Sequence, residues 1–450
     1  MLALSWLAET SDAATTVALF ASHPVATPAT PTLASGPEVV RWRAVQPTTS
    51  LAGSDGTLAI DLFDRTVVAR HQRTILNPSG SRSWIGTLPA VRPGEADGLV
   101  VLVQRDDITI GSIRHDGALF MLLYSGLRSE GLQSEGLQSK GLGEETGVHV
   151  LLEIDERAPR FRHEEPTPAR IDGAHDAKGT TKASPPPRGT PQDDGSIQDL
   201  MVVYTPLALD DLGGSVTATE TLIELGVTET NLSYETSGID HRLRLVHTAL
   251  TDFDELEPTG IDARDHLQDP DDGFMDEIHP LRDLYRADLV KLLTSRGCGR
   301  AFIMDVISAA HEEFAFCRTS VVCVSPGYTF AHELGHVASG RHQRPFAVDG
   351  SPLPYNFGYI DAANRFRTIM AAGESECPSG CPRRLAWSNP DVLDPTTGAP
   401  MGVPEGDPEA ADNRKAMNFT ASVVANFRVS EQPFFGDGFE SGDLSAWSPP

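Results

Sequence analysis

The chain has 450 residues, of which 40% are hydrophobic and 22% are charged. This length and composition exclude a small disulfide-only scaffold and a wholly disordered protein, and predict two or three folding units. The formal charge of −27, of which −20 lies on residues 201–450, argues against a protein that binds nucleic acid or an anionic membrane by electrostatics.

The first 37 residues are predicted to be a leader and an unstructured segment, because residues 22–37 are rich in Pro, Thr, Ala and Ser. A signal peptide should begin with positive charge, yet the first basic residue is Arg41, and Glu9 and Asp12 interrupt the apolar residues. Either the leader is atypical or the true start differs. No run of 18 apolar residues occurs, so we expect no membrane-spanning helix.

Residues 38–156 are predicted to form a small antiparallel β domain, because short apolar or alternating runs are separated by turn signals. A five-residue repeat over residues 126–145 is expected to be a loop between two strands rather than a binding tract. The predicted strands are residues 57–63, 98–104, 108–113, 118–124 and 148–154.

Residues 157–197 are polar and rich in Pro and Gly, with scattered Arg and Lys, which predicts a linker that carries a proteolytic processing site. The segment that follows, residues 198–428, alternates between strand and helix patterns and predicts an α/β (α+β) domain with a mixed sheet. Residues 429–450 are a short acidic tail. Strands are predicted at residues 200–204, 241–250 and 287–293, and helices at 215–234, 272–286, 329–337 and 411–427.

All five cysteines lie in the C-terminal half, and this clustering indicates one oxidised domain and hence export. Cys377 and Cys381 are spaced for a small stapled loop. Cys298 is expected to pair with Cys323 or with Cys317, and Cys317 is our candidate for the unpaired residue.

The most informative stretch is Thr329–His342, which contains three closely spaced histidines. His332 and His336 are four residues apart, so they project from one face of a helix and can reach one tetrahedral metal ion. A helix break at Ser339-Gly340, where glycine can adopt the left-handed conformation, would let His342 return as third ligand. Glu333 is placed to take a proton from water at the metal.

Five isolated histidines are expected to be surface residues, or core residues with satisfied hydrogen bonds, rather than metal ligands: His241, His247, His266, His279 and His311.

His332-Glu333-x-x-His336 with His342 resembles the extended zinc motif of the metzincin metallopeptidases, His-Glu-x-x-His-x-x-Gly-x-x-His. Here Ser339 stands at the glycine position of that motif. Residues 366–373 resemble the Met-turn of the same family, which implies that Met370 forms an apolar floor beneath the metal.

The resemblance extends over residues 197–428 to the bacterial peptidyl-Asp metalloendopeptidases, which are reprolysin-like metzincins. It is carried by segments such as 199–206, 229–234, 388–391 and 411–413. The β region at 38–156 is similar to the propeptide of these enzymes. The resemblance implies one catalytic zinc ion and cleavage of proteins or peptides on the amino side of acidic residues. Many relatives carry Tyr two residues after the Met-turn methionine, where this chain has Ala372.

We therefore predict a secreted or periplasmic zinc endopeptidase that acts as a monomer, with Glu333 as general base and its own propeptide as intramolecular inhibitor. A cysteine switch is excluded because no cysteine precedes Cys298. Latency would depend on an acidic side chain or on steric cover.

Two other functions compete with this prediction. A zinc hydrolase with a small substrate should carry an acidic third ligand in place of His342. A non-catalytic adhesion or binding protein could retain the metzincin scaffold, but intact Glu333 and three histidines argue against it.

Two further features concern ligands. An acidic enzyme that cleaves beside acidic residues needs a local arginine pocket, for which Arg341, Arg344 and Arg367 are candidates. Structural calcium could bind at residues 269–273, although a solvated loop before a helix is the simpler interpretation.

Overall fold

The chain divides into two compact units in the computed structural model. The first unit contains Met1–Glu156 and Leu212–Leu225, and the second contains Arg157–Asp211 and Gly226–Pro450. Of the predicted linker, the described residues 157–161, 164–169 and 193–197 belong to the second unit. The structure describes residues 16–430 except 23–24, 26–28, 48–50, 52–55, 93–95, 127–146, 162–163, 170–192, 258, 345–350, 373–376 and 378–379.

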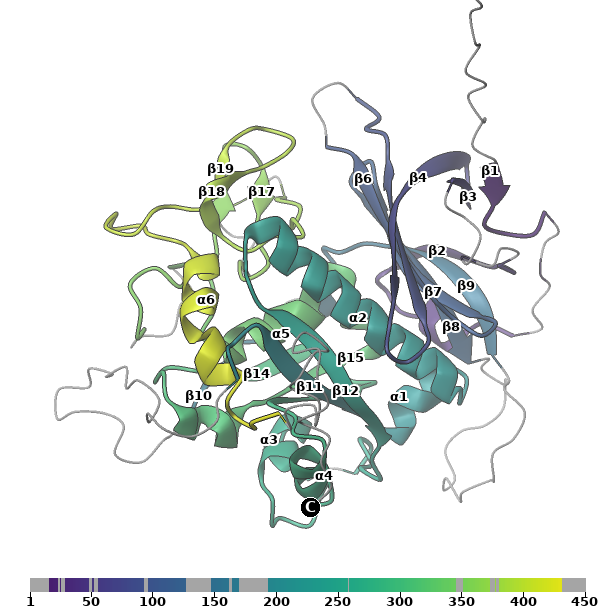
Figure 1. Cartoon of the computed structure of the whole chain (residues 1–450). Coiled ribbons are helices and arrows are strands. Elements are labelled where there is room, and N and C mark those ends of the chain that lie inside the picture. The colour runs from purple at the N-terminus through teal and green to yellow at the C-terminus, as the bar shows by residue number, and fades with distance from the viewer. Residues whose placement is uncertain are drawn as a thin grey trace, which may run out of the picture. The chain divides into compact units, whose positions relative to one another are not determined.

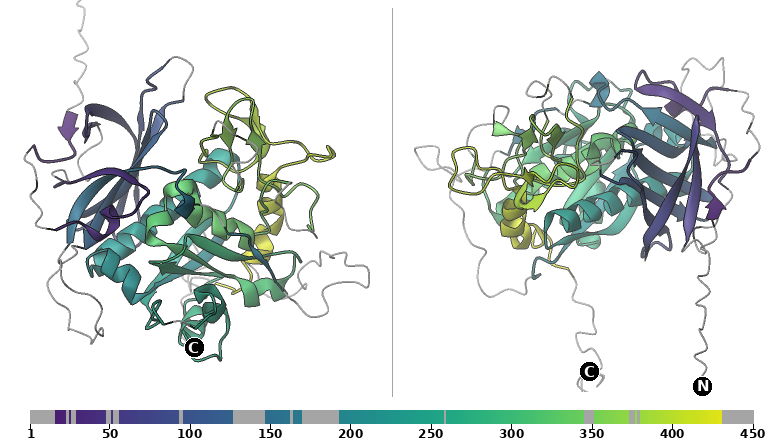
Figure 2. Two further views of the ribbon diagram at one scale, coloured as in Figure 1. Left: turned by 180° about the vertical axis from the view of Figure 1, so that it is seen from behind. Right: turned by 90° about the horizontal axis from the view of Figure 1, so that it is seen from above.

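The first unit is built on a nine-stranded sheet, which Figures 1 and 2 show to be strongly twisted. All its pairings are antiparallel except that between β1 and β3, in agreement with the predicted antiparallel domain. In order along the sheet the strands are β1 (Thr16–Ala18), β3 (Thr57–Leu62), β4 (Arg65–Leu76), β5 (Arg82–Leu88), β6 (Gly98–Arg105), β7 (Ile108–His115), β8 (Ala118–Gly126), β9 (Gly147–Ile154) and β2 (Val39–Ala44).

Some of these strands were not predicted. In β4 half-buried and exposed side chains alternate, but polar residues occupy many positions on both faces. The sequence of β4 therefore lacks the alternation of apolar and polar residues from which a strand is predicted. Strand β1 and the short helix Thr32–Ala34 lie in the segment that was expected to be unstructured. Gly126 of β8 pairs with Gly147 of β9, so the five-residue repeat connects two neighbouring strands, as predicted. Beyond Gly126, the repeat lies outside the described residues.

The second unit contains the predicted mixed sheet. Strands β11, β12, β13 and β15 are parallel, and β14 is antiparallel to β15. Every residue of β13 is buried, as expected for a parallel strand that is covered on both faces. The order is β10 (Thr167–Pro168), β14 (Gly299–Ile303), β15 (Phe316–Ser320), β13 (Leu289–Thr294), β11 (Ile197–Tyr204) and β12 (Arg242–Leu250), with short pairs β16 (Ile360–Asp361) with β17 (Phe366–Arg367) and β18 (Asn389–Leu393) with β19 (Pro400–Met401).

Helices agree with the prediction where the apolar spacing is clear. None of those in the described ranges is long and apolar enough to span a membrane. The final helix is capped by Asp412, whose carboxylate accepts a hydrogen bond from Lys415 N. The helices are α1 (Pro206–Asp211), α2 (Val216–Ser237), α3 (Ala263–Gln268), α4 (Ile278–Leu284), α5 (Thr329–Val337) and α6 (Asn413–Val424).

The prediction of a helix over residues 272–286 was wrong about where the helix begins. It begins only at Ile278, because Met275 has a φ of 58° and interrupts helical geometry. The Asp272 carboxylate does not cap it: Oδ2 is 2.6 Å from His266 Nδ1 and Oδ1 accepts from Phe274 N. Helix α3, which was not predicted, does have an aspartate cap, because the Asp262 carboxylate accepts a hydrogen bond from Arg264 N.

Two disulfides fix loops of the second unit. Cys298 pairs with Cys323 and Cys377 with Cys381, while Cys317 is a buried free thiol. The stapled loop and the choice of unpaired cysteine agree with the sequence prediction. The Cys298–Cys323 bridge joins the residue before β14 to the short turn after β15.

Two of the isolated histidines are core residues, as expected, but among the described residues they lack the hydrogen bonds that were predicted for them. His241 and His311 are fully buried, and their ring nitrogens have no hydrogen-bond partner among the described residues. His241 packs edge-on against Tyr234, and His311 lies near Phe314 and Phe427. Burial, together with a nearby arginine in each case, lowers the pKa of both histidines to about 3.

These two histidines should make the protein sensitive to mild acid. Below pH 6.5 the unfolded chain binds protons that the folded chain excludes down to about pH 3, so stability falls over that range. Each histidine should cost about 2 kcal/mol of unfolding free energy between pH 7 and pH 5. Urea unfolding at both pH values should show a smaller loss for His241→Leu and His311→Leu. Losses equal to that of wild type would contradict the assignment.

Candidate active site

Three buried histidines meet at the C-terminal end of α5. His332 and His336 lie one turn apart on the helix, and His342 returns from the loop that follows. The Nε2 atoms are 3.1 Å apart for His332–His336, 3.1 Å for His332–His342 and 3.2 Å for His336–His342. Among the described residues, this is the cluster of three ligand-type side chains that could hold a metal ion.

The hydrogen bonds of the outer ring nitrogens show why this cluster suits a cation. His332 Nδ1 lies 2.8 Å from the Ile369 carbonyl and His336 Nδ1 lies 2.8 Å from the Gly340 carbonyl. A carbonyl only accepts, so each Nδ1 carries the proton and each Nε2 presents a lone pair. Lone pairs this close repel one another unless a cation lies between them, and the spacing is near the roughly 3.3 Å edge of a tetrahedral zinc site.

The turn that brings His342 back differs from the predicted one. Ser339, with a φ of 76°, adopts the left-handed conformation that the prediction gave to glycine. Asn356 holds Ser339 there, because its Nδ2 donates to the Ser339 carbonyl at 2.5 Å and to Oγ at 3.1 Å. Gly340 is required for another reason: a Cβ at this position would lie 2.9 Å from the Gly335 carbonyl oxygen. The serine therefore preserves the turn.

Glu333, the predicted base, is buried beside the edge of the sheet. A Cβ at Gly299 of β14 would lie within 2.3 Å of Glu333 Oε1, so glycine leaves the space that this carboxyl group fills. Burial raises the pKa of Glu333 to about 8, against the opposing effects of Lys291 and Arg318. Lys291 is itself buried, and its ammonium group donates to Thr319 Oγ1 at 2.9 Å.

Met370 lies directly beneath the histidine helix. It is fully buried, and its Sδ would be 2.7 Å from a Cβ placed at Gly335, between His332 and His336. The ring of Trp387 approaches the same position at 2.5 Å and is anchored by a hydrogen bond from Nε1 to Ser233 Oγ. Glycine at 335 thus allows a thioether and an indole to pack against the backbone that carries the histidines.

A segment that was predicted to be linker also reaches the site. Glu165 Oε2 lies 3.5 Å from His342 Nδ1, and Thr167–Pro168 form strand β10 beside β14. Sequence reasoning missed these residues because a polar stretch with prolines is typical of a linker.

The other predicted ligand sites are occupied by local interactions. Arg344 Nη2 donates to the carbonyls of Pro354 and Ala410, and Arg367 Nη1 donates to that of Ala372. Arg341 is buried.

The carboxylates of the proposed calcium loop accept hydrogen bonds from nearby groups. Asp269 accepts from Asp271 N, and Asp272 interacts with His266 and Phe274 N. These interactions give no support to a calcium site in the loop at residues 269–273.

Comparisons with known proteins agree with this site. Residues 221–343, which end just after His342, match the family described as Metallo-peptidase family M12B Reprolysin-like. A peptidyl-Asp metalloendopeptidase of Xanthomonas campestris pv. campestris is 29% identical over 423 residues, which cover 91% of each chain. One from Stenotrophomonas maltophilia is 30% identical over 387 residues, covering 82% of this chain and 83% of that protein. The chain is a metalloendopeptidase and belongs to the family of reprolysin-like peptidyl-Asp metalloendopeptidases.

Proposed function

We propose that the chain is a secreted, monomeric endopeptidase that holds one zinc ion on His332, His336 and His342 and cleaves on the amino side of acidic residues. The observation that carries the proposal is the convergence of three buried Nε2 atoms, two of which belong to rings fixed by carbonyl acceptors. The acidic specificity is suggested by the names of the relatives. The disulfides support export.

Zinc, when bound, supplies Lewis acidity to the scissile carbonyl and to the attacking water. Glu333 accepts a proton from that water and returns it to the leaving amine. Burial raises the pKa of Glu333, which favours the protonated form that returns the proton to the leaving amine. Met370 and Trp387 support α5 from beneath, so the histidines stay in register during turnover.

Removing a ligand should remove the metal. We expect about one zinc per chain in the wild-type protein and almost none in His336→Ala, since two histidines alone form an incomplete site. The matched control is His247→Ala, a partly buried histidine that stacks on Tyr285 and should keep its zinc. Elemental analysis after dialysis measures both. Stoichiometric zinc in His336→Ala would refute the ligand set.

Replacing the base should separate catalysis from metal binding. Glu333→Gln keeps the shape of the side chain but cannot accept the proton, so kcat should fall by about 10²–10⁴-fold. Zinc content and melting temperature should stay near those of the wild type. Hydrolysis of casein with and without chelator provides the measurement. A variant with near wild-type turnover would show that Glu333 is not the base.

Latency and maturation form the last part of the proposal. The β domain at residues 38–156 acts as a propeptide, and cleavage between residues 157 and 197 releases the active enzyme. N-terminal sequencing of active secreted protein should find a first residue within that range. Active enzyme that still begins before residue 150 would disprove this maturation step.

A further inference from the structure

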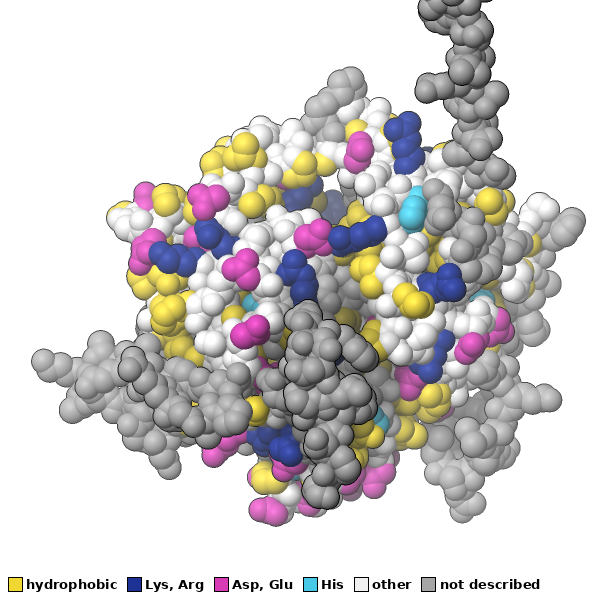
Figure 3. All heavy atoms as spheres, in the orientation of Figure 1, with side chains coloured by type: hydrophobic (Ala, Val, Ile, Leu, Met, Phe, Trp, Pro, Cys, Tyr) yellow, Lys and Arg dark blue, Asp and Glu magenta, His cyan; other side chains and the backbone are white. Residues whose placement is uncertain are grey.

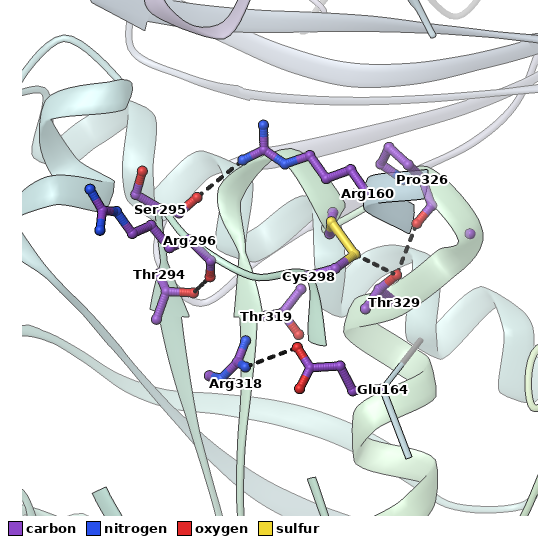
Figure 4. Close-up of a disulfide and its surroundings, with 12 residues drawn as sticks. Arg160, Glu164, Thr294, Ser295, Arg296, Cys298, Arg318, Thr319, Pro326 and Thr329 are labelled. Atoms are coloured by element: carbon purple, nitrogen blue, oxygen red, sulfur yellow. Dashed lines mark hydrogen bonds and ion pairs between the residues drawn. A yellow bond between two sulfur atoms is a disulfide. The ribbon is translucent and has the colours of Figure 1, made fainter. Parts of the chain in front are cut away.

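The segment over residues 164–169 brings an acidic side chain to a pair of arginines. Glu164 Oε1 accepts a hydrogen bond from Arg318 Nη2 at 3.2 Å, and Glu164 Oε2 lies 3.6 Å from Arg300 Nη1. Figure 4 shows Glu164 and Arg318 facing each other. The two arginines are register partners on adjacent strands, β14 and β15, so their side chains share one face of the sheet. A carboxylate is therefore held by two cations on a rigid platform.

The same segment passes the three histidines. The residue after Glu164 is Glu165, whose carboxylate is 3.5 Å from His342 Nδ1. Thr167 and Pro168 then pair in parallel with Phe302 and Ile303 of β14. Without β10, β14 would be the outer strand of the sheet, and an open edge accepts an extended peptide through its main-chain groups. The segment thus lies where a peptide bound to this edge would pass the site.

A second carboxylate, that of Asp262, also interacts with both arginines. Asp262 accepts hydrogen bonds from Arg318 Nε at 2.8 Å and Nη2 at 2.7 Å, and lies 3.3 Å from Arg300 Nη1. Asp262 is also the cap of α3, which fixes its position. Burial raises its pKa, but the hydrogen bonds from Arg318 outweigh this and hold the pKa well below its usual range, so Asp262 stays ionised.

A count of charges shows what this cluster lacks without Glu164. Arg300 and Arg318 balance Asp262 and Glu164, so loss of Glu164 leaves one uncompensated positive charge. Arg318 is 7% exposed, and its buried Nη1 has no acceptor among the residues that the structure describes. Asp262 alone would then pair with both arginines, so this group of side chains would keep one excess positive charge that favours the return of a carboxylate.

We propose that Arg318 and Arg300 form the subsite for the acidic side chain of the substrate, and that Glu164 occupies this subsite as a substrate mimic in the uncleaved chain. The inference rests on the proposed acidic specificity. Glu164 and Glu165 then act together: the first fills the specificity subsite, and the second lies against a zinc ligand. Glu164 and Glu165 are therefore the acidic side chains through which latency would act.

The subsite is tested by the cleavage preference of the active secreted enzyme. Paired peptides with Asp or Asn at each position around the scissile bond give the ratio of kcat/KM values. Wild type should favour Asp at one position. Arg318→Lys keeps the charge but removes the Nη2 donor, so it should lower that ratio at least about tenfold, the usual loss for a hydrogen bond to a charged group. Arg300 interacts with Glu164 through charge at 3.6 Å, so Arg300→Gln should also lower the ratio, whereas Arg300→Lys should retain most of it.

The control is Arg344→Gln, which removes an arginine near His342 that binds carbonyls and should leave the ratio unchanged. A wild-type enzyme without acidic preference would refute both the proposed specificity and the subsite. Acidic preference that survives in Arg300→Gln and Arg318→Lys would refute the subsite alone. Melting temperatures confirm that the variants are folded, and Arg300 serves as the safer site because its side chain is a third exposed.

The mimic is tested with the peptide Glu-Glu-Pro-Thr-Pro, the sequence of residues 164–168, and its variant with Gln first. The Glu peptide should inhibit the wild-type enzyme at least about tenfold better than the Gln peptide. The difference should vanish in Arg300→Gln, as a double-mutant cycle requires for a direct contact. Equal inhibition by both peptides, or none by either, would overturn the role of Glu164.

Discussion

The convergence of three imidazole lone pairs is the constraint on which the rest of the second unit depends. Three Nε2 lone pairs within 3.2 Å of one another suit a cation placed between them, and the surrounding structure holds the rings in position for it. It does so through backbone groups: carbonyls of Ile369 and Gly340 fix two rings, and the turn at Ser339 directs the third. A divalent cation held by these three atoms would link α5 to the loop that follows it, which couples metal affinity to folding.

A second constraint is electrostatic and concerns Glu333. This carboxyl group is buried, so its ionised form needs nearby positive charge. The sheet provides it from the strands that face α5, since Lys291 of β13 and Arg318 of β15 both oppose the rise in pKa. Lys291 lies over the ring of Phe330 with its Nζ 4.7 Å from the ring centroid, so the lysine is held by a cation–π contact and a hydrogen bond. The pKa of the Glu333 carboxyl group is therefore a property of the sheet as well as of the helix.

The parts of this site that sequence predicts are those set by local spacing. Helix α5 follows from the apolar periodicity and the His332–His336 interval, and the Cys377–Cys381 loop follows from its short separation. The partner of Cys298 could not be decided, because Cys317 and Cys323 differ only in their place in the fold. Cys317 is inside β15 and faces the core, whereas Cys323 lies beyond the strand end and can reach Cys298.

The parts that escaped prediction depend on long-range pairing. Strand β10 joins β14 across 135 residues, and neither strand has a distinctive hydrophobic pattern. Proline normally argues against a strand, yet Pro168 is tolerated because β10 is the outermost strand and its missing N–H costs no ladder hydrogen bond. The left-handed Ser339 likewise depends on Asn356, a contact between residues far apart in sequence that no local rule could supply.

Net charge and local charge act at different distances in this protein. The excess of acidic residues should repel an acidic substrate, but on the face seen in Figure 3 acidic and basic side chains are interspersed rather than separated into large patches. In physiological salt, exposed charges more than about 8 Å apart are largely screened, whereas a contact with a buried arginine is not. In the proposed subsite, an acidic peptide would therefore respond mainly to Arg318 and Arg300. Arg318 is almost completely buried, and Asp262 holds its guanidinium group in place. Two arginines could therefore produce a preference for acidic substrates even though the net charge of the whole chain opposes it.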